Sequence, residues 1–268
     1  MKLDNNTLAQ LAEHLENAEL KAHDVTKITD EYPDMDWDDA YAIQDEIKRR
    51  KLARGNKIAG LKAGLTSRAK MKQMGVETPV FGFIADYMSV PDGGEVKFDE
   101  LIHPKVEAEI CVVTKAPLRG PGCHIGNVMA AIDFVLPAVE VIDSRYRDFK
   151  FDLKSVIADN TSSARFVIGG NMRDLGELDL PTLGVVLEVN GEVKSMAAGA
   201  ACAARAVRPW PSRSSITAWS TTTATATPCP RLGARRCRPS CRSSDSSIIP
   251  ISRKVSFVRW ASTNARPR

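Results

Sequence analysis

The first 201 residues of this chain contain only two cysteines, Cys111 and Cys123, and no long apolar run. Two cysteines are too few for the disulfide framework that stabilises many small secreted domains. The N-terminus, MKLDNNTLAQ, has no apolar core of the signal-peptide type, and no stretch approaches the length that spans a bilayer. We therefore expect a soluble, cytoplasmic protein with no membrane partner.

Acidic residues are almost absent after residue 201. Twelve arginines and one lysine there accompany a single acid, Asp245, which gives that segment a net charge of +12. The residues before it hold 24 basic and 32 acidic side chains, a net charge of −8, so the overall +4 describes neither part. Four of the six cysteines also lie after residue 201. The chain therefore changes its composition at this point.

Two helices are predicted near the N-terminus. Residues 5–21 and 36–55 place apolar side chains at helical spacing, with polar residues between them. Asp36 can cap the start of the second helix and Gly55 can end it. These segments form the N-terminal helical region, 1–56.

From residue 57 the pattern changes to short strand-like runs separated by glycine and proline, with a hairpin signal at Asn190-Gly191. Residues 125–136 have the spacing of a helix instead. Helices followed by many short strands favour an α+β domain with a curled mixed sheet. We assign a mixed-sheet domain to residues 57–201.

The remaining segment, 202–268, has no periodicity. Its Ser, Thr, Arg, Pro and Cys-rich sequence offers no apolar face, so it cannot bury enough surface to offset the entropy of ordering. We expect an irregular, disordered tail.

Two glutamates interrupt an apolar run in PKVEAEIC at 104–111. In a strand, Glu107 and Glu109 share one face, and Glu140 lies in a second apolar run, LPAVEVI. Three carboxylates on neighbouring strands would form an oxygen-rich pocket suited to Mg²⁺ or Mn²⁺. The alternative is that Glu-x-Glu lies on a solvated strand face.

Lys62 follows a strand-like run in KIAGLKAGLTS and precedes Gly64. A lysine in such a place can have a lowered pKa or neutralise a substrate carboxylate. The alternative is a lysine at a strand end with its head group in water.

Three segments together resemble a known family: GLKAGLTSRAKMKQMGVETPVFGFIADY, HPKVEAEI and PAVEVIDSRYRDFKFDLKSVIADNTSS. In this order they are similar to the hydratase and decarboxylase branch of the fumarylacetoacetate hydrolase superfamily, which acts on products of aromatic ring meta-cleavage. The resemblance extends to about Ala201, or about three quarters of the chain. It implies the superfamily's mixed β-roll with helices outside, usually in an oligomer.

The resemblance also implies a metal-dependent site. A divalent cation, Mg²⁺ or Mn²⁺, would be held at the Glu107, Glu109 and Glu140 positions as a Lewis acid for the substrate ketone. Lys62 would be the functional lysine, which supports an enolate or orients a carboxylate.

Contacts with a small dicarboxylate substrate are expected from Thr66, Arg145, Asp159 and Asn160. Arg145 would meet the distal carboxylate, and the Asp159-Asn160 pair would orient Lys62 or the substrate. Arginine after a strand is also common at surfaces, and Asp-Asn is common in turns.

Position 80 separates the two activities of this branch. Its hydratases typically have an aspartate before the aromatic residue of a P-D-F-G segment, whereas this chain has Val80 in TPVFG. Because valine can neither donate nor accept a proton, Val80 favours the decarboxylases, which convert 2-oxohex-3-enedioate to 2-hydroxypenta-2,4-dienoate and CO₂. The alternative is a hydratase of 2-hydroxypenta-2,4-dienoate in which Val80 is a packing variation. The resemblance to these decarboxylases also implies a homo-oligomer and a complex with vinylpyruvate hydratase.

The tail departs from the pattern of this branch, which continues into a helix near a Leu-Gly-His-Pro segment. We interpret 202–268 as the product of a frameshift near codons 198–205, which would remove part of the sheet and leave the chain inactive. A noncatalytic partner subunit is a third reading. A nucleic-acid-binding arm or a zinc site at Cys237 and Cys241 would need a repeated module or a matching pair, which the tail lacks, so we expect no nucleic-acid partner.

Overall fold

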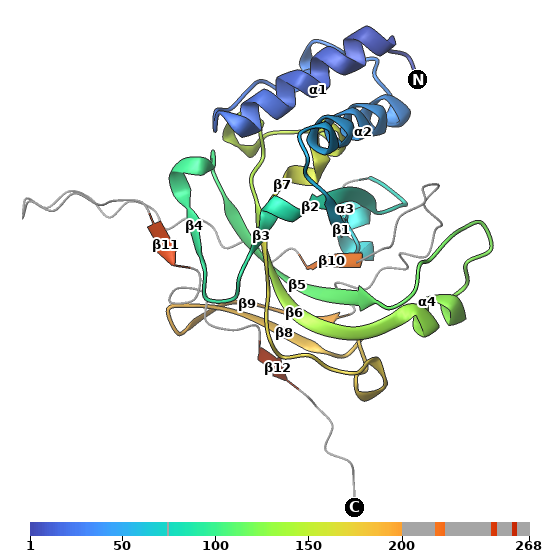
Figure 1. Cartoon of the computed structure of the whole chain (residues 1–268), viewed down its shortest axis with the longest axis vertical. Helices are drawn as coiled ribbons and strands as arrows, with labels where there is room; N and C mark the ends of the chain where they lie inside the picture. Colours follow the sequence, from blue (N-terminus) through green and yellow to red (C-terminus); the bar gives the residue numbers. More distant parts are fainter. Residues whose placement is uncertain (74, 200–217, 223–247, 251–258, 262–268) are drawn as a thin grey trace, which may run out of the picture.

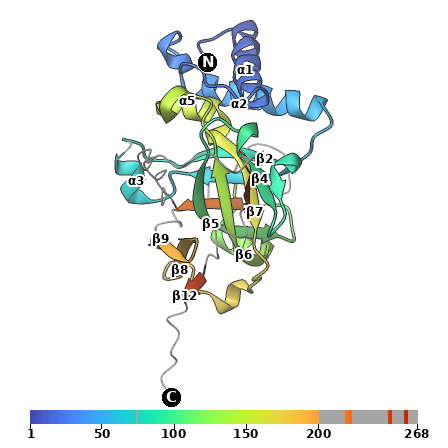
Figure 2. The same ribbon diagram turned by 90° about the vertical axis from the view of Figure 1, so that its left-hand side faces the viewer.

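The computed structural model of the protein describes residues 1–73, 75–199, 218–222, 248–250 and 259–261. The N-terminal helices lie at one end of the molecule, and a strongly curved sheet fills its centre (Figure 1). Figure 2 shows the same helices above the sheet after a quarter turn. The α+β class and the mixed sheet predicted from the sequence are therefore confirmed.

The two N-terminal helices are α1 (Asn5–Leu20) and α2 (Trp37–Ala53). Asp36 caps α2 as predicted, since its carboxylate accepts from the backbone N–H of Asp39 at 2.9 Å, and Asp39 caps Asp36 in return. The apolar faces of both helices pack against Phe83 and Tyr146 of the sheet region in one cluster. The helices are thereby held on one end of the sheet.

The strands of residues 57–199 are β1 (Ile58–Gly64), β2 (Val80–Ala85), β3 (Ser89–Val90), β4 (Glu95–Lys97), β5 (Lys105–Thr114), β6 (Ile132–Ile142), β7 (Ser163–Ile168), β8 (Gly184–Val189) and β9 (Glu192–Ala198). Three short α-helices accompany them, α3 (Arg68–Gln73), α4 (Ile125–Ala131) and α5 (Leu153–Ala158). Single 3₁₀ turns lie at Ile28–Asp30, Asp86–Met88, Phe98–Glu100, Arg147–Phe149, Asn160–Ser162 and Leu175–Glu177. Among the described residues, no helix has the length and apolar character needed to cross a membrane.

The main sheet has the strand order β2-β1-β10-β5-β6-β7-β3, in which β10 is Ala218–Thr222, and it contains both parallel and antiparallel pairs. The long antiparallel pair of β5 and β6 forms its centre. A three-stranded sheet has the order β12-β8-β9, in which β12 is Arg259–Ala261. Its strand β8 packs Val185 and Leu187 against Ala108 and Ile110 on one face of β5. The other face of β5 is therefore left for the side chains of Glu107 and Glu109.

The prediction of a helix over residues 125–136 is confirmed only for its first half. α4 ends at Ala131, and the chain continues as β6, where Leu136 lies opposite Cys111 of β5. Ile132, Val135 and Leu136 have helical spacing, but pairing with β5 along one edge and a bridge from Val135 to Arg173 on the other edge outweigh this local preference.

The tail contains three short strands, β10 (Ala218–Thr222), β11 (Ile248–Pro250) and β12 (Arg259–Ala261), where the sequence predicts irregular chain. The backbone of β10 lies between β1 and β5. An open strand edge presents N–H and C=O groups that an extended segment can pair with, whatever its side chains. The other residues after 199, including Cys237 and Cys241 and most of the proposed frameshift, lie outside the described part.

Candidate metal centre

Three buried glutamates meet on the inner face of the β5–β6 pair. Glu107 and Glu109 point to the same face of β5, and Glu140 of β6 lies directly opposite Glu107 in the strand register. One carboxylate oxygen from each lies within 4.8 Å of the others. Their exposed fractions are 4%, 1% and 5%, so the alternative of a solvated strand face is wrong.

This donor set fits a hard divalent cation. Carboxylates so close together repel one another, and burial makes that repulsion costly unless positive charge compensates it. Oxygen ligands from carboxylates are those that Mg²⁺ and similar hard cations prefer. The register of two adjacent strands thus places three such ligands around one point.

Lys62 of β1 reaches the same cluster from the neighbouring part of the sheet. Its Nζ donates to Glu140 Oε1 at 2.5 Å and to the backbone oxygen of Thr161 at 3.0 Å. The lysine is 3% exposed, so the reading with its head group in water is wrong. Lys62 therefore supplies a positive charge directly beside one predicted metal ligand.

Thr66 and Val80 lie at the far end of the β1–β2 pair. Thr66 is buried just after β1, four residues beyond Lys62. Val80 pairs with Gly64 and packs in the apolar cluster beneath α1 and α2. Position 80 therefore carries no titratable group and is filled by packing.

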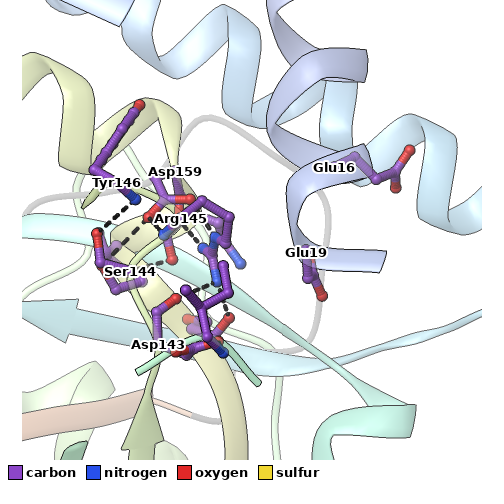
Figure 3. Close-up of polar contacts among 12 residues, drawn as sticks. Glu16, Glu19, Asp143, Ser144, Arg145, Tyr146 and Asp159 are labelled. Atoms are coloured by element: carbon purple, nitrogen blue, oxygen red, sulfur yellow. Dashed lines mark hydrogen bonds and ion pairs between the residues drawn. The ribbon is translucent and has the colours of Figure 1, made fainter. Parts of the chain in front are cut away.

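Arg145 and Asp159 form a separate buried pair (Figure 3). The Arg145 guanidinium contacts the Asp159 carboxylate and backbone oxygen, and its Nη1 donates to the backbone oxygens of Asp143 at 2.7 Å and Ser163 at 3.0 Å. The structure thus joins Arg145 to protein acceptors rather than to the three glutamates. Its predicted contact with the substrate stays a prediction.

Burial has opposite consequences for the two partners of this pair. Burial raises the pKa of Asp159 to about 6, although the nearby Arg145 guanidinium acts to lower it. Burial acts to lower the pKa of Arg145, but the attraction of Asp159 and Glu19 outweighs it, and the pKa is raised. Glu19 lies at the end of α1 beside this pair in Figure 3.

Asn160 contacts β2 and not Lys62. Its side-chain oxygen accepts from the backbone N–H of Phe83 at 2.8 Å, and its Nδ2 donates to the Phe83 oxygen at 2.9 Å. The group that reaches Lys62 is the backbone carbonyl of the next residue, Thr161. The sequence predicts a role for the Asp159-Asn160 pair but gives no signal for a backbone oxygen.

Asp143 was also missed by sequence reasoning. Its carboxylate accepts from the backbone N–H groups of Ile102 at 2.9 Å and His103 at 2.7 Å. These contacts hold the segment that leads into β5. They thereby help to set where Glu107 and Glu109 lie along the sheet. An aspartate directly after an apolar strand, as in VIDSR, is the only sequence signal for this function.

Comparison with known proteins gives a consistent result, although no family model matches the chain. The chain is 66% identical over 199 residues to a 4-oxalocrotonate decarboxylase of Pseudomonas putida, across 74% of this chain and 75% of that relative. It is 37% identical over 199 residues to a 2-keto-4-pentenoate hydratase of Burkholderia vietnamiensis, across 74% of this chain and 76% of that relative.

A solved structure is also similar. The 4-oxalocrotonate decarboxylase from Pseudomonas putida G7, complexed with magnesium and adipate, matches with a TM-score of 0.76 and 56% identity. The match covers 85% of this chain and 92% of that protein. Sequence and structure therefore agree, and the chain belongs to the family of 4-oxalocrotonate decarboxylases and 2-keto-4-pentenoate hydratases.

Proposed function

We propose that this chain is a divalent-cation-dependent carboxy-lyase that converts 2-oxohex-3-enedioate to 2-hydroxypenta-2,4-dienoate and CO₂. The observation that carries this proposal is the meeting of Glu107, Glu109 and Glu140, with Lys62 bonded to one of them, in a chain 66% identical to a 4-oxalocrotonate decarboxylase. Adipate, bound in a related structure with magnesium, is a six-carbon dicarboxylate like this substrate.

Glu107, Glu109 and Glu140 would hold the cation, either Mg²⁺ or Mn²⁺. When bound, it supplies Lewis-acid polarisation to a ketone or carboxylate oxygen of the substrate. The three glutamates offer carboxylate oxygens as acceptors in a buried site. Their burial excludes water, which strengthens the electrostatic interactions at the centre.

Lys62 contributes a fixed positive charge to the reaction. Loss of CO₂ from the distal end moves an electron pair through the C3–C4 double bond toward the C2 oxygen. The Lys62 ammonium stabilises negative charge that develops on an oxygen near Glu140, or orients a carboxylate there. Because Thr161 also accepts from Lys62, the ammonium is held in place before the reaction begins.

Position 80 has no side chain that can transfer a proton, which favours a decarboxylase over a hydratase. Val80 lies in an apolar cluster and can neither deliver nor remove a proton. A hydratase would add water to 2-hydroxypenta-2,4-dienoate without releasing CO₂. Incubation of the purified chain with each substrate, followed by measurement of CO₂ and of 4-hydroxy-2-oxopentanoate, distinguishes the two activities.

CO₂ release in the presence of Mg²⁺ tests the site assignment. Glu109→Gln should lower the rate at least about 100-fold, since it removes a charged ligand from the centre. Glu95→Gln, which changes an exposed glutamate on β4, is the matched control and should behave like the parent chain. An unchanged rate and unchanged metal affinity in the Glu109 variant would exclude this site.

The same assay tests whether the chain is an inactive frameshift product. A second version, in which the codons after residue 201 are read in the frame that restores a Leu-Gly-His-Pro segment, should be assayed beside it. Activity only in the second version would establish the inactive product. Metal binding without CO₂ release in both would indicate a noncatalytic partner subunit.

We also propose that the protein assembles as a homo-oligomer and forms a complex with vinylpyruvate hydratase. Both proposals rest on the resemblance to the decarboxylase branch. Light scattering of the purified chain, alone and after mixing with the hydratase, tests them directly. A monomer that does not change mass on mixing would contradict both.

A further inference from the structure

The turn between α5 and β7 has an uncommon backbone conformation. Asn160, Thr161 and Ser162 all have left-handed φ values, of 48°, 51° and 59°. None is a glycine, and a β-branched residue such as Thr161 adopts this region rarely. Such a conformation persists only where its surroundings impose it.

The surroundings of this turn are fully buried and hydrogen-bonded. The Asn160 side chain pairs with both backbone groups of Phe83, in the way that a neighbouring strand would. The Ser162 oxygen accepts from the backbone N–H of Asp143 at 2.8 Å, and the Ser162 N–H donates to the Asp159 oxygen at 3.0 Å. The turn is thereby fixed against β2 on one side and the end of β6 on the other.

The turn gives Lys62 one of its two acceptors. The Thr161 oxygen accepts from Lys62 Nζ at 3.0 Å, while the same Nζ donates to Glu140 Oε1 at 2.5 Å. Of these two acceptors, Glu140 is also a proposed metal ligand, and Thr161 is not. The Thr161 carbonyl is therefore the anchor that does not depend on the state of the metal centre.

Gly82 makes this close approach possible. It lies opposite Lys62 in the β1–β2 register. A Cβ at this position would be 2.3 Å from Thr161 Oγ1 and 3.0 Å from both the backbone and side-chain oxygens of Asn160. Any other residue at position 82 would therefore push the turn away from β2.

We infer that Gly82 and the Asn160–Ser162 turn position Lys62, by placing the Thr161 carbonyl where it holds the ammonium beside Glu140. They act through Lys62 and do not themselves touch reacting atoms. The catalytic role of Lys62 in this inference rests on the proposed function. The positioning itself can be measured without turnover.

Competitive acetylation followed by mass spectrometry measures how well the Lys62 ammonium is held. In Gly82→Ala, acetylation of Lys62 relative to exposed Lys150 should rise at least about fivefold, which corresponds to the loss of a hydrogen bond of about 1 kcal/mol. Gly170→Ala is the matched control, because a Cβ there meets no atom within 4 Å. Its Lys62 labelling should equal that of the parent chain.

A second variant protects the test against misfolding of Gly82→Ala. Asn160→Asp has nearly the same shape and keeps the acceptor for the Phe83 N–H, but it loses the donor to the Phe83 oxygen. Far-ultraviolet circular dichroism selects folded variants, and Lys62 labelling should rise in each one. Unchanged Lys62 labelling in a folded Gly82→Ala or Asn160→Asp protein would overturn the inference.

Measurement of kcat and KM shows whether Gly82 positions Lys62 or only supports the fold. In an active chain, Gly82→Ala should lower kcat at least about fivefold with KM nearly unchanged, because an anchoring hydrogen bond of about 1 kcal/mol is lost. A fall in kcat with unchanged Lys62 labelling would contradict positioning. If the parent chain neither binds Mg²⁺ nor releases CO₂, the proposed function fails, and the labelling contrast still decides the inference.

Discussion

Two groups of buried charges lie close together along the chain and differ in how their charges are matched. Glu140 near the end of β6 belongs to a cluster of three carboxylates. Five residues later, Arg145 is paired with one carboxylate, Asp159, and with backbone oxygens. The first group places three negative charges around one point. In the second group, the positive charge of Arg145 lies directly beside the negative charge of Asp159.

The α1–α2 contact follows the second pattern. Glu16 accepts from Arg50 and Arg54, each at 2.6 Å, and Glu19 accepts from Lys51 at 2.7 Å. These ion pairs hold the N-terminal helices together next to Arg145. Burial of charge is thus common in this fold, and the gathering of like charges is what distinguishes the proposed metal centre.

The largest expected effect comes from reducing the like charge at the centre. In metal-free protein, Glu107→Gln should leave the free energy of unfolding unchanged or raise it, because it removes repulsion between carboxylates. The same variant should lose Mg²⁺-dependent CO₂ release by at least about 100-fold. Urea unfolding in EDTA and the CO₂ assay measure the two properties. A marked loss of metal-free stability would show that the cluster is a structural element.

Breaking the buried Arg145–Asp159 pair should instead lower the free energy of unfolding. Arg145→Met leaves Asp159 buried without its partner, so the free energy of unfolding should fall by about 3–5 kcal/mol. Arg147→Met is the control, since Arg147 is exposed and pairs with Asp24 at 3.3 Å. Urea unfolding of both variants gives the comparison. Equal effects would remove the distinction between the buried pair and an exposed one.

The pH dependence of stability sharpens the same contrast. The pKa of Asp159 is about 6 in the folded chain and 3.8 as the ordinary value, so the folded state holds its proton over a wider pH range. Stability should therefore fall by about 2 kcal/mol as the pH rises from about 4 to about 6 through this group. Asp159→Asn should lack that component. Urea unfolding of both chains across this range, in EDTA, tests it, and parallel curves would contradict the assignment.

The smallest effect is expected at an exposed pair. Arg49 donates to Glu46 on α2, and the Arg49 side chain is 69% exposed. Arg49→Ala should change the free energy of unfolding by about 0.5 kcal/mol or less, and high salt should reduce even that. A loss comparable to that of Arg145→Met would mean that burial is not what distinguishes the pairs.

The parts of the site that the sequence predicts are those set by strand periodicity. Alternation along β5 places Glu107 and Glu109 on one face, and a second apolar run with Glu140 supplies the third carboxylate of the cluster. The run KIAGLKAGLTS and the family resemblance both pointed to Lys62, which the structure places beside Glu140. These predictions succeed because a strand fixes the directions of its side chains within a few residues.

The other parts depend on contacts between distant segments. Residues 132–136 look helical by spacing, yet they pair with β5. The Thr161 carbonyl reaches Lys62 because an uncommon turn packs against Gly82, and a backbone oxygen has no sequence signature. The partners of Arg145 come from three separate positions along the chain, which spacing does not reveal, and its contact with the substrate stays a prediction.

The most direct test of the central claim is calorimetric titration of Mg²⁺ into EDTA-treated and then desalted protein, parent chain against Glu109→Gln. We predict one saturable Mg²⁺ site in the parent chain and at least about a tenfold loss of affinity in the variant, because one of three charged ligands is removed. Glu95→Gln should bind as the parent chain does. Equal Mg²⁺ affinity in the parent chain and the Glu109 variant would contradict the assignment of this cluster as the metal centre.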